Sequence, residues 1–292
     1  MTEAKKRIAF TFLCIAGMAV PVAGAGIIIF LISKGWQTLG ISLIFGNVPV
    51  IDAILLKKRV FNGLFPAMAG SFALVFISVF ISLPVGMGAA IYFSEYASKK
   101  VRKLAGISVD ILASAPSIVI GLAGFSAAIL MHRHVSESIS PCLLMSAMSL
   151  AVLTLPYIIR STQLALESVP ESLRMAGLSL GASRFDNLVH VVLPDSVPGI
   201  MSGIVLAISR CAEDTAVIML TGAVASAGVP DSLLRPFEAI PFYIFYTSSE
   251  YTSPQELATA YGAALVLMIV CLSLFVFSYL LKRSVHKGYA GK

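Results

Sequence analysis

Long apolar stretches separated by short polar segments run along the whole chain. A helix needs about 20 apolar residues to cross the roughly 30 Å of hydrocarbon in a bilayer, and six stretches reach that length. We place the spans at Ile8–Ser33, Phe65–Tyr92, Ile107–Met131, Ile139–Ile159, Val197–Ala223 and Leu257–Leu281. The pattern therefore predicts an all-α integral membrane protein with six transmembrane helices.

The first span is separated from the other five by a predicted outer loop, Lys34 to Leu64. The remaining spans follow one another without a long linker. We therefore divide the chain into an N-terminal helix with its outer loop (1–64), a membrane domain (65–285) and a cytoplasmic tail (286–292). The first apolar run is long and continues without a small-residue cleavage site, so we expect an anchor rather than a signal peptide.

The distribution of charge sets the orientation. Only 12% of the residues are charged, against about a quarter in soluble proteins. With both termini in the cytoplasm, fourteen of the 21 basic residues lie on the inner side, as the positive-inside rule requires. Lys57, Lys58 and Arg59 are the exception, because this topology places them outside. The net charge of +6 thus reflects topology, and no soluble basic face for nucleic acid is apparent.

Metal-binding patterns are weak in this sequence. Each of the four cysteines lies in a different apolar stretch, without the close spacing of a metal site or a local disulfide. His132 and His134 flank Arg133 on the outside, but they do not form one of the spaced His, Cys and carboxylate sets that are typical of a metal site. We therefore expect no metal ion in this chain.

A segment with helical periodicity connects the fourth and fifth spans, from Ser161 to Pro194. Pro170 can open a first short helix, and Gly181 can turn the chain after it. The apolar stripe of this helix is Leu173, Ala176 and Leu180, while Ser172, Arg174 and Ser179 face away.

A second short helix follows this turn. Ser183 and Asp186 form a start that is similar to a capping box. Leu193-Pro194 is expected to end the helix, and its apolar face is Phe185, Leu188, Val189 and Val192. The two helices together predict a docking element that inserts Phe185 into a groove on a partner.

The spacing from Met175-Ala176-Gly177 through Gly181 to Val191-Val192-Leu193-Pro194 resembles the EAA loop of ABC-importer permeases. The resemblance implies that 65–285 is a type-1 ABC transmembrane domain whose loop docks on a separate ATPase. Met175 replaces the usual Glu of the family, which puts one polar contact with the ATPase in doubt but not the docking itself. The ATPase-coupling residues that it implies are Ala176, Gly177, Gly181, Phe185, Leu193 and Pro194.

The chain has no G-x-x-x-x-G-K-[ST] pattern and therefore no phosphate-cradling loop for nucleotide. ATP is expected to bind to a homodimer of partner ATPase subunits, with no cofactor in this chain.

Three charged residues, Arg210, Glu213 and Asp214, lie in the fifth span. Ionised groups are costly in lipid, so we expect them to face the protein interior. On a helix, Arg210 meets Glu213 at i+3 and Asp214 at i+4. The group is either a structural ion pair or a site where the guanidinium meets a passing oxyanion. Arg160, at the inner end of the fourth span, is a second contact or an interfacial anchor.

Several segments resemble the phosphate-importer permeases, the PstA type more than its PstC partner. They include Ala115 through Leu122, Leu155 through Arg160, Arg210 through Ala216 and Ile240 through Ile244. The resemblance implies a path for inorganic phosphate lined by Arg210, Glu213, Asp214, Thr215 and Arg160. It also implies a second, PstC-like permease, an external phosphate-binding protein received by the outer loops, especially 230–254, and the plasma (inner) membrane of a prokaryote.

The sequence leaves alternatives open. In the family's R-x-x-G-E-T-A pattern, Asp214 takes the Glu position and Glu213 replaces a Gly. An extra carboxylate beside an anion path keeps another oxyanion, such as molybdate, tungstate or sulfate, under consideration. A membrane-embedded enzyme with Glu213 or Asp214 as general base would require polar partners in other spans. The other spans carry almost no ionisable groups, which counts against an enzyme. A passive channel would not require the EAA-like loop.

Overall fold

The computed structural model describes residues 3–58, 60, 63–136 and 140–290. Arg59 and Ile139, the predicted start of the fourth span, lie outside the described residues. The long helices are α1 (Glu3–Gly35), α4 (Phe65–Ile91), α5 (Lys99–Ser114), α6 (Ser117–His134), α7 (Leu143–Glu167), α10 (Leu193–Glu213) and α13 (Pro254–Ala290). The shorter helices are α2 (Ile41–Phe45), α3 (Val50–Ile54), α8 (Glu171–Ser179), α9 (Arg184–Asn187), α11 (Ala216–Thr221) and α12 (Ile240–Glu250).

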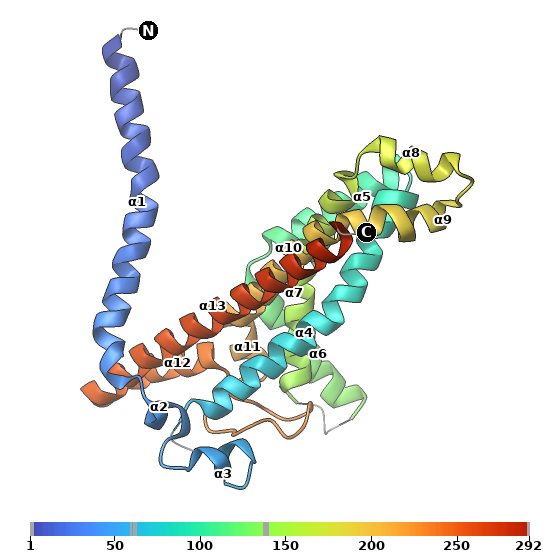
Figure 1. Cartoon of the computed structure of the whole chain (residues 1–292). Coiled ribbons are helices and arrows are strands. Elements are labelled where there is room, and N and C mark those ends of the chain that lie inside the picture. The colour runs from blue at the N-terminus through green and yellow to red at the C-terminus, as the bar shows by residue number, and fades with distance from the viewer. Residues whose placement is uncertain (1–2, 59, 61–62, 137–139, 291–292) are drawn as a thin grey trace.

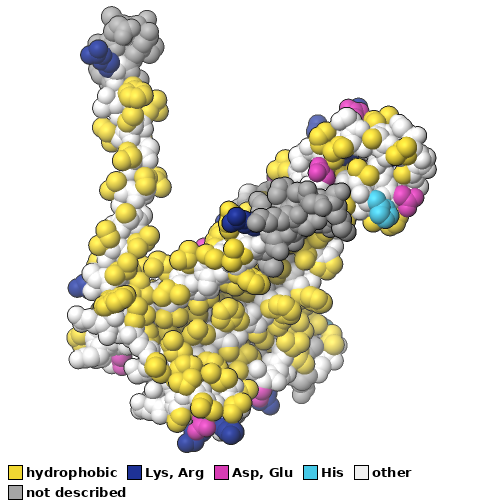
Figure 2. Space-filling model, viewed as in Figure 1, with side chains coloured by type: hydrophobic (Ala, Val, Ile, Leu, Met, Phe, Trp, Pro, Cys, Tyr) yellow, Lys and Arg dark blue, Asp and Glu magenta, His cyan; other side chains and the backbone are white. Residues whose placement is uncertain are grey.

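Six helical segments within these described residues are long and apolar enough to cross a membrane. They are Phe10–Thr38, Phe65–Tyr96, Ser117–His134, Leu143–Glu167, Arg184–Glu213 and Pro254–Phe277. The predicted six-span, all-α architecture is therefore confirmed. Figure 2 shows the corresponding surface: apolar side chains cover the middle of the bundle, and charged side chains gather near its two ends.

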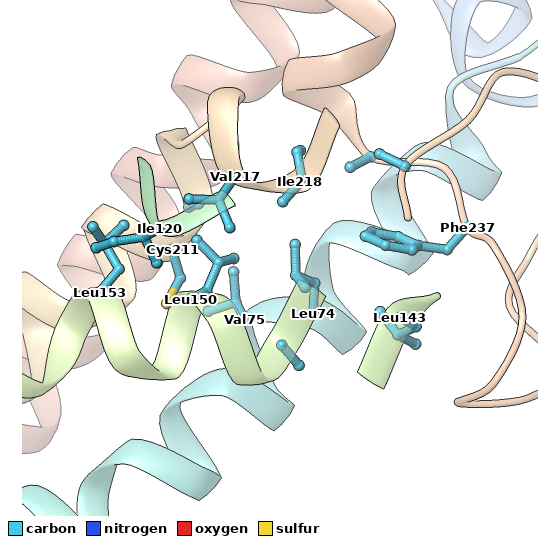
Figure 3. Packing of buried hydrophobic residues seen from close by; sticks show 14 residues of the cluster. Leu74, Val75, Ile120, Leu143, Leu150, Leu153, Cys211, Val217, Ile218 and Phe237 are labelled. Carbon is cyan, nitrogen blue, oxygen red and sulfur yellow. The ribbon is translucent and has the colours of Figure 1, made fainter. Parts of the chain in front are cut away.

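The central core forms where α4, α7 and α11 meet. Leu74 of α4, Leu150 of α7 and Ile218 of α11 are almost completely buried in it. Phe237, from the loop before α12, is completely buried in the same core (Figure 3). Apolar side chains gain little when they move from lipid hydrocarbon into a helix interface. Close van der Waals packing between the helices stabilises the bundle instead. Burial in this core therefore positions α7 and α10, which carry the candidate site.

Helix α1 stands apart from the bundle over most of its length (Figure 1). None of its most apolar stretch is buried. Its contact with α13 lies near its end, where the rings of Phe30 and Tyr261 pack edge to face, 5.7 Å apart. The described part of this first span thus contacts the bundle mainly through α13.

Two of the predicted spans are not continuous helices, so their predicted boundaries are wrong. The predicted third span, Ile107–Met131, is interrupted at Ala115-Pro116, and only α6 is classed as a membrane-spanning helix. The predicted fifth span, Val197–Ala223, ends at Glu213, and Asp214 adopts an extended backbone before α11 begins. The first break is explained by Pro116, which has no backbone N–H to donate and disfavours a helical conformation for Ala115.

The end of the molecule that carries α2 and α3 also carries the connection from α11 to α12 (Figure 1). A second apolar core joins α2, α4, α12 and α13 there and includes Leu64 and Ile240. The segment 230–254, expected as an outer loop, contains the helix α12. Pro241 in the first turn of α12 was the available signal for this helix.

Candidate functional site

The segment between α7 and α10 is a compact two-helix element. Helix α7 extends to Glu167, so the connection is shorter than the predicted stretch that began at Ser161. Helix α8 follows Pro170, and Gly181 has a φ of +85°, the left-handed conformation expected for the turn. The Ser183 hydroxyl accepts a hydrogen bond from the Asp186 N–H at 3.1 Å and so caps α9. These local predictions are confirmed.

The predicted end of the second helix at Leu193-Pro194 is wrong. The backbone continues from α9 through a π-helical turn, Leu188–Val192, directly into α10. Pro194 lies in the first turn of α10. A proline is tolerated there because the first N–H groups of a helix have no intrahelical acceptor.

One residue of α8 faces differently from the prediction. Arg174, expected to face away, points into the protein, and its guanidinium bonds the Glu95 carboxylate at 2.8 and 3.0 Å. The apolar side chains that are exposed on α8 and the turn after it are Leu173, Met175, Leu178 and Leu180. Phe185 of α9 is 64% exposed. We name Leu173, Met175, Leu178, Leu180 and Phe185 the docking surface.

Gly177 allows α8 and α9 to lie close together. A Cβ atom at this position would overlap the Asn187 side-chain oxygen and contact Val191. Asn187 is buried, and its amide nitrogen donates to the Arg174 carbonyl at 3.1 Å. Gly177 and Asn187 thus hold the two helices together, while Ala176 on the same helix is exposed.

Arg210 lies where α10 passes α7. Its guanidinium donates to the Tyr157 hydroxyl at 3.1 Å and lies over the Tyr157 ring, 5.4 Å from its centroid. The Glu213 carboxylate is 3.5 Å from the guanidinium, so the predicted i+3 pair is present. The side chains of Arg210 and Glu213 are 46% and 54% exposed.

The depth of this cluster follows from the register of α7. Tyr157 lies fourteen residues after Leu143 and ten before Glu167 in this helix. At 1.5 Å per residue, these separations are about 21 and 15 Å. The last turn of α10, with Arg210 and Glu213, therefore lies beside the middle of the α7 span, where hydrocarbon could not stabilise an exposed guanidinium or carboxylate.

Asp214 is not part of the predicted i+4 pair with Arg210. Its carboxylate accepts a hydrogen bond from the Val217 N–H at 2.9 Å, which caps the start of α11. A carboxylate is well suited to this position because it satisfies an otherwise free N–H and interacts favourably with the helix dipole. Thr215, half-buried, is the residue directly before α11.

Arg160 lies away from Arg210 and pairs with α5. Its guanidinium bonds the Asp110 carboxylate at 2.5 and 3.1 Å and the Gly106 carbonyl at 3.0 Å. The side chains of Arg160 and Asp110 are both partly exposed. Arg160 therefore joins α5 to α7 and does not share the cluster around Arg210.

Sequence reasoning missed Tyr157, Asp110 and Glu95 as partners of the three arginines. Tyr157 and Arg210 are 53 positions apart, and Asp110 and Arg160 are 50 apart. Glu95 lies 79 positions from Arg174, so none of the three pairs leaves a local signal in the sequence.

Comparisons with known proteins agree with this architecture. A family model described as binding-protein-dependent transport system inner membrane component matches residues 82–287. A phosphate transport system permease protein PstA of Haemophilus influenzae is 31% identical over 85% of this chain and 84% of its own length. A PstA protein of Yersinia pestis is 35% identical over 72% of this chain and 70% of its own length.

A solved structure has the same fold. It is a chain of a bacterial ABC transporter involved in the import of the acidic polysaccharide alginate, with a TM-score of 0.61, 17% identity and coverage of 97% of this chain and 99% of that chain. The chain therefore belongs to the family of binding-protein-dependent transport system inner membrane components and, within it, to the PstA-type permeases.

Proposed function

We propose that this chain forms part of the transmembrane path for inorganic phosphate in an ATP-driven importer. The observation that carries the proposal is the half-exposed Arg210 near the middle of a span. A bilayer does not solvate that face, so an aqueous path or another protein must cover it. The names of the relatives support phosphate as the cargo.

Arg210 is the residue we propose for anion contact. Its planar guanidinium presents several N–H donors in a geometry that suits two oxygens of one oxyanion. Tyr157 orients it from one side, and Glu213 lies on the other. Asp214 and Thr215 support the site indirectly, because they form the start of α11 directly after the cluster. Arg160 is proposed to position α5 against α7.

Permeases of this family work with ATPase subunits and an external binding protein. In this chain, we propose that the docking surface binds one subunit of an ATPase homodimer, which binds and hydrolyses the ATP. Ala176, Gly177 and Gly181 shape the element, Phe185 inserts into the partner, and Leu193 and Pro194 pass its movement into α10. The exposed apolar side chains support this role, because five such residues at one end of a membrane protein fit a protein partner.

A second, PstC-like permease is proposed to cover the face that exposes Arg210. The end that carries α8 and α9 is then cytoplasmic, together with both termini. The opposite end, with the segment 224–239 and α12, receives the phosphate-binding protein. The inner segments contain most of the basic residues, which supports this orientation.

The alternative cargo is another oxyanion, such as molybdate, tungstate or sulfate. It stays open because Glu213, 3.5 Å from Arg210, stands where the PstA pattern has a glycine. Its negative charge weakens the attraction of the site for each of these anions and for phosphate, so this carboxylate does not choose among them.

Uptake of labelled phosphate tests the proposal. The chain is reconstituted into vesicles with its candidate partner permease, ATPase and binding protein, and uptake is measured with and without ATP. ATP-dependent phosphate uptake is expected. Uptake that does not need ATP would exclude an ABC importer, and molybdate uptake without phosphate uptake would change the cargo.

The role of Arg210 is tested in the same vesicles. Arg210→Ala should reduce phosphate uptake at least tenfold while the complex still assembles. Arg133→Ala is the matched control, since Arg133 is an exposed arginine in the last turn of α6. Loss of assembly by Arg210→Ala alone would favour a structural ion pair instead.

A further inference from the structure

Arg174 attaches helix α8 to the rest of the chain. No residue of α8 is buried, so this helix has no apolar core of its own. The Arg174 guanidinium instead bonds the Glu95 carboxylate and the carbonyls of Leu166 and Val169 at the end of α7. One side chain thus joins α8, the last turn of α7 and the segment after α4.

The Arg174–Glu95 ion pair differs from the surface pairs of this protein. Its two side chains are only 23% and 19% exposed, against 66% and 59% for Arg235 and Asp231. Two Glu95 oxygens lie at 2.8 and 3.0 Å from one guanidinium nitrogen. Limited solvent access strengthens such a contact and restricts the positions that the two side chains adopt.

Glu95 lies in a π-helical turn, Tyr92–Tyr96, that ends α4. A second arginine bonds the same turn: Arg102 of α5 donates to the Phe93 carbonyl at 2.8 Å and to the Ser94 carbonyl. Arg102 also lies 3.7 Å from Glu167 at the end of α7. The turn that ends α4 is therefore bonded from both α8 and α5.

Helix α5 in turn contacts the membrane-spanning helices. The Asp110–Arg160 pair joins it to α7, and its end at Ser114 precedes the break at Pro116. A continuous set of ionic contacts and helices thus connects the docking surface with the helices around the proposed path.

We propose that the Arg174–Glu95 ion pair transmits movement of the bound ATPase to α4 and α5. Arg174 and Glu95 are then positioning residues for transport, and neither contacts the anion. This inference rests on the proposed function, because it assumes that the ATPase binds the docking surface. In this inference, the coupling between ATPase movement and transport depends on contacts within this chain, between Arg174 of α8 and Glu95.

The test uses the full complex in vesicles with the phosphate-loaded binding protein. It measures three quantities: ATPase retained on the purified chain, ATP hydrolysis, and phosphate transported per ATP. Glu95→Gln and Arg174→Met should retain the ATPase but reduce phosphate transported per ATP at least fivefold. Glu95→Asp keeps the charge, so its phosphate transported per ATP should lie between that of these variants and that of the wild type. Asp195→Asn, an exposed carboxylate change at the same end of the molecule, is the matched control and should be unchanged.

A double-mutant cycle distinguishes a shared contact from two separate effects. If the residues act through one ion pair, Glu95→Gln with Arg174→Met should be no worse than either single variant. Additive losses, normal coupling in the single variants, or loss of bound ATPase from them would each overturn the inference. Failure of the wild-type chain to retain the ATPase would instead overturn the proposed function.

Discussion

Arg210 and Tyr157 form the most unusual polar contact in the membrane-spanning part of this protein. A guanidinium near the middle of a bilayer requires partners, and Tyr157 offers both a hydroxyl acceptor and an aromatic face. The two residues come from different helices, so their contact also fixes the relative position of α7 and α10.

Tyr157→Phe tests the part of this contact that depends on the hydroxyl. The ring remains, but the hydrogen bond of 3.1 Å is lost. Phosphate uptake in vesicles should fall roughly tenfold or more, since a hydrogen bond to a charged group contributes about 1.5 to 3 kcal/mol. Tyr279→Phe, on the exposed surface of α13, is the control. Wild-type uptake by Tyr157→Phe would show that the aromatic face alone orients Arg210.

Glu238 is a buried carboxyl outside the six spans. Burial raises the pKa of Glu238 above its ordinary value of 4.5, and the hydrogen bond from the Gly228 N–H, at 2.7 Å, opposes this effect. A raised pKa in the folded state means that the folded protein binds the proton more tightly than the unfolded chain. Its stabilising contribution is therefore complete below pH 4.5 and is lost as the pH rises through the folded-state pKa.

Glu238→Gln should remove this pH dependence, because an amide oxygen can accept the same hydrogen bond without ionising. The wild-type melting temperature should drop relative to that of Glu238→Gln as the pH rises from about 4.5 to 8. Thermal unfolding of the detergent-solubilised chain across this range checks the prediction. Parallel pH curves for the two proteins would contradict it.

At the scale of elements, the docking element depends on close contact between α8 and α9. Gly177→Ala would place a methyl group against Asn187. Overpacking of this kind typically costs about 1 to 3 kcal/mol, so the docking surface should distort and retention of the ATPase should decrease. Affinity purification of the chain with its ATPase measures the effect.

A second substitution and a control make this prediction specific. Asn187→Ala combined with Gly177→Ala creates room for the methyl group and should recover part of the bound ATPase. Gly88→Ala, where a Cβ would meet nothing within 4 Å, should have no effect. Equal loss of ATPase from Gly88→Ala and Gly177→Ala would argue against a local clash.

At the scale of the whole molecule, the two ends of the bundle have different surfaces. The docking surface lies at the end with α8 and α9, and the segment after α11 lies at the end with α2 and α3 (Figure 1). The proposed orientation places these ends on opposite sides of the membrane.

Single reporter cysteines test this orientation. Ala225→Cys, after α11, should react with a membrane-impermeant maleimide in intact cells, whereas Ser179→Cys, at the end of α8, should react only after the membrane is opened. Both positions are exposed. The unsubstituted chain, with its own four cysteines, supplies the background. The opposite labelling pattern would place the docking surface outside and exclude a cytoplasmic ATPase there.

Hydropathy alone predicted the number and approximate position of the spans. In hydrocarbon, every backbone N–H and C=O group needs an internal partner, so a long apolar stretch has essentially one stable conformation, the helix. Local chemistry likewise predicted the turn at Gly181 and the cap at Ser183, because neighbouring residues supply both interactions.

Tertiary structure decided which way the charged side chains face. Arg174 was expected to face away, yet it is the residue by which α8 contacts the bundle, because its partner Glu95 lies 79 positions earlier in the chain. Asp214 was assigned to a helical pair, yet its carboxylate caps α11 once the chain leaves the helix. The Arg210–Tyr157 and Arg160–Asp110 contacts join residues at least 50 positions apart, and only the folded arrangement of helices brings such side chains together.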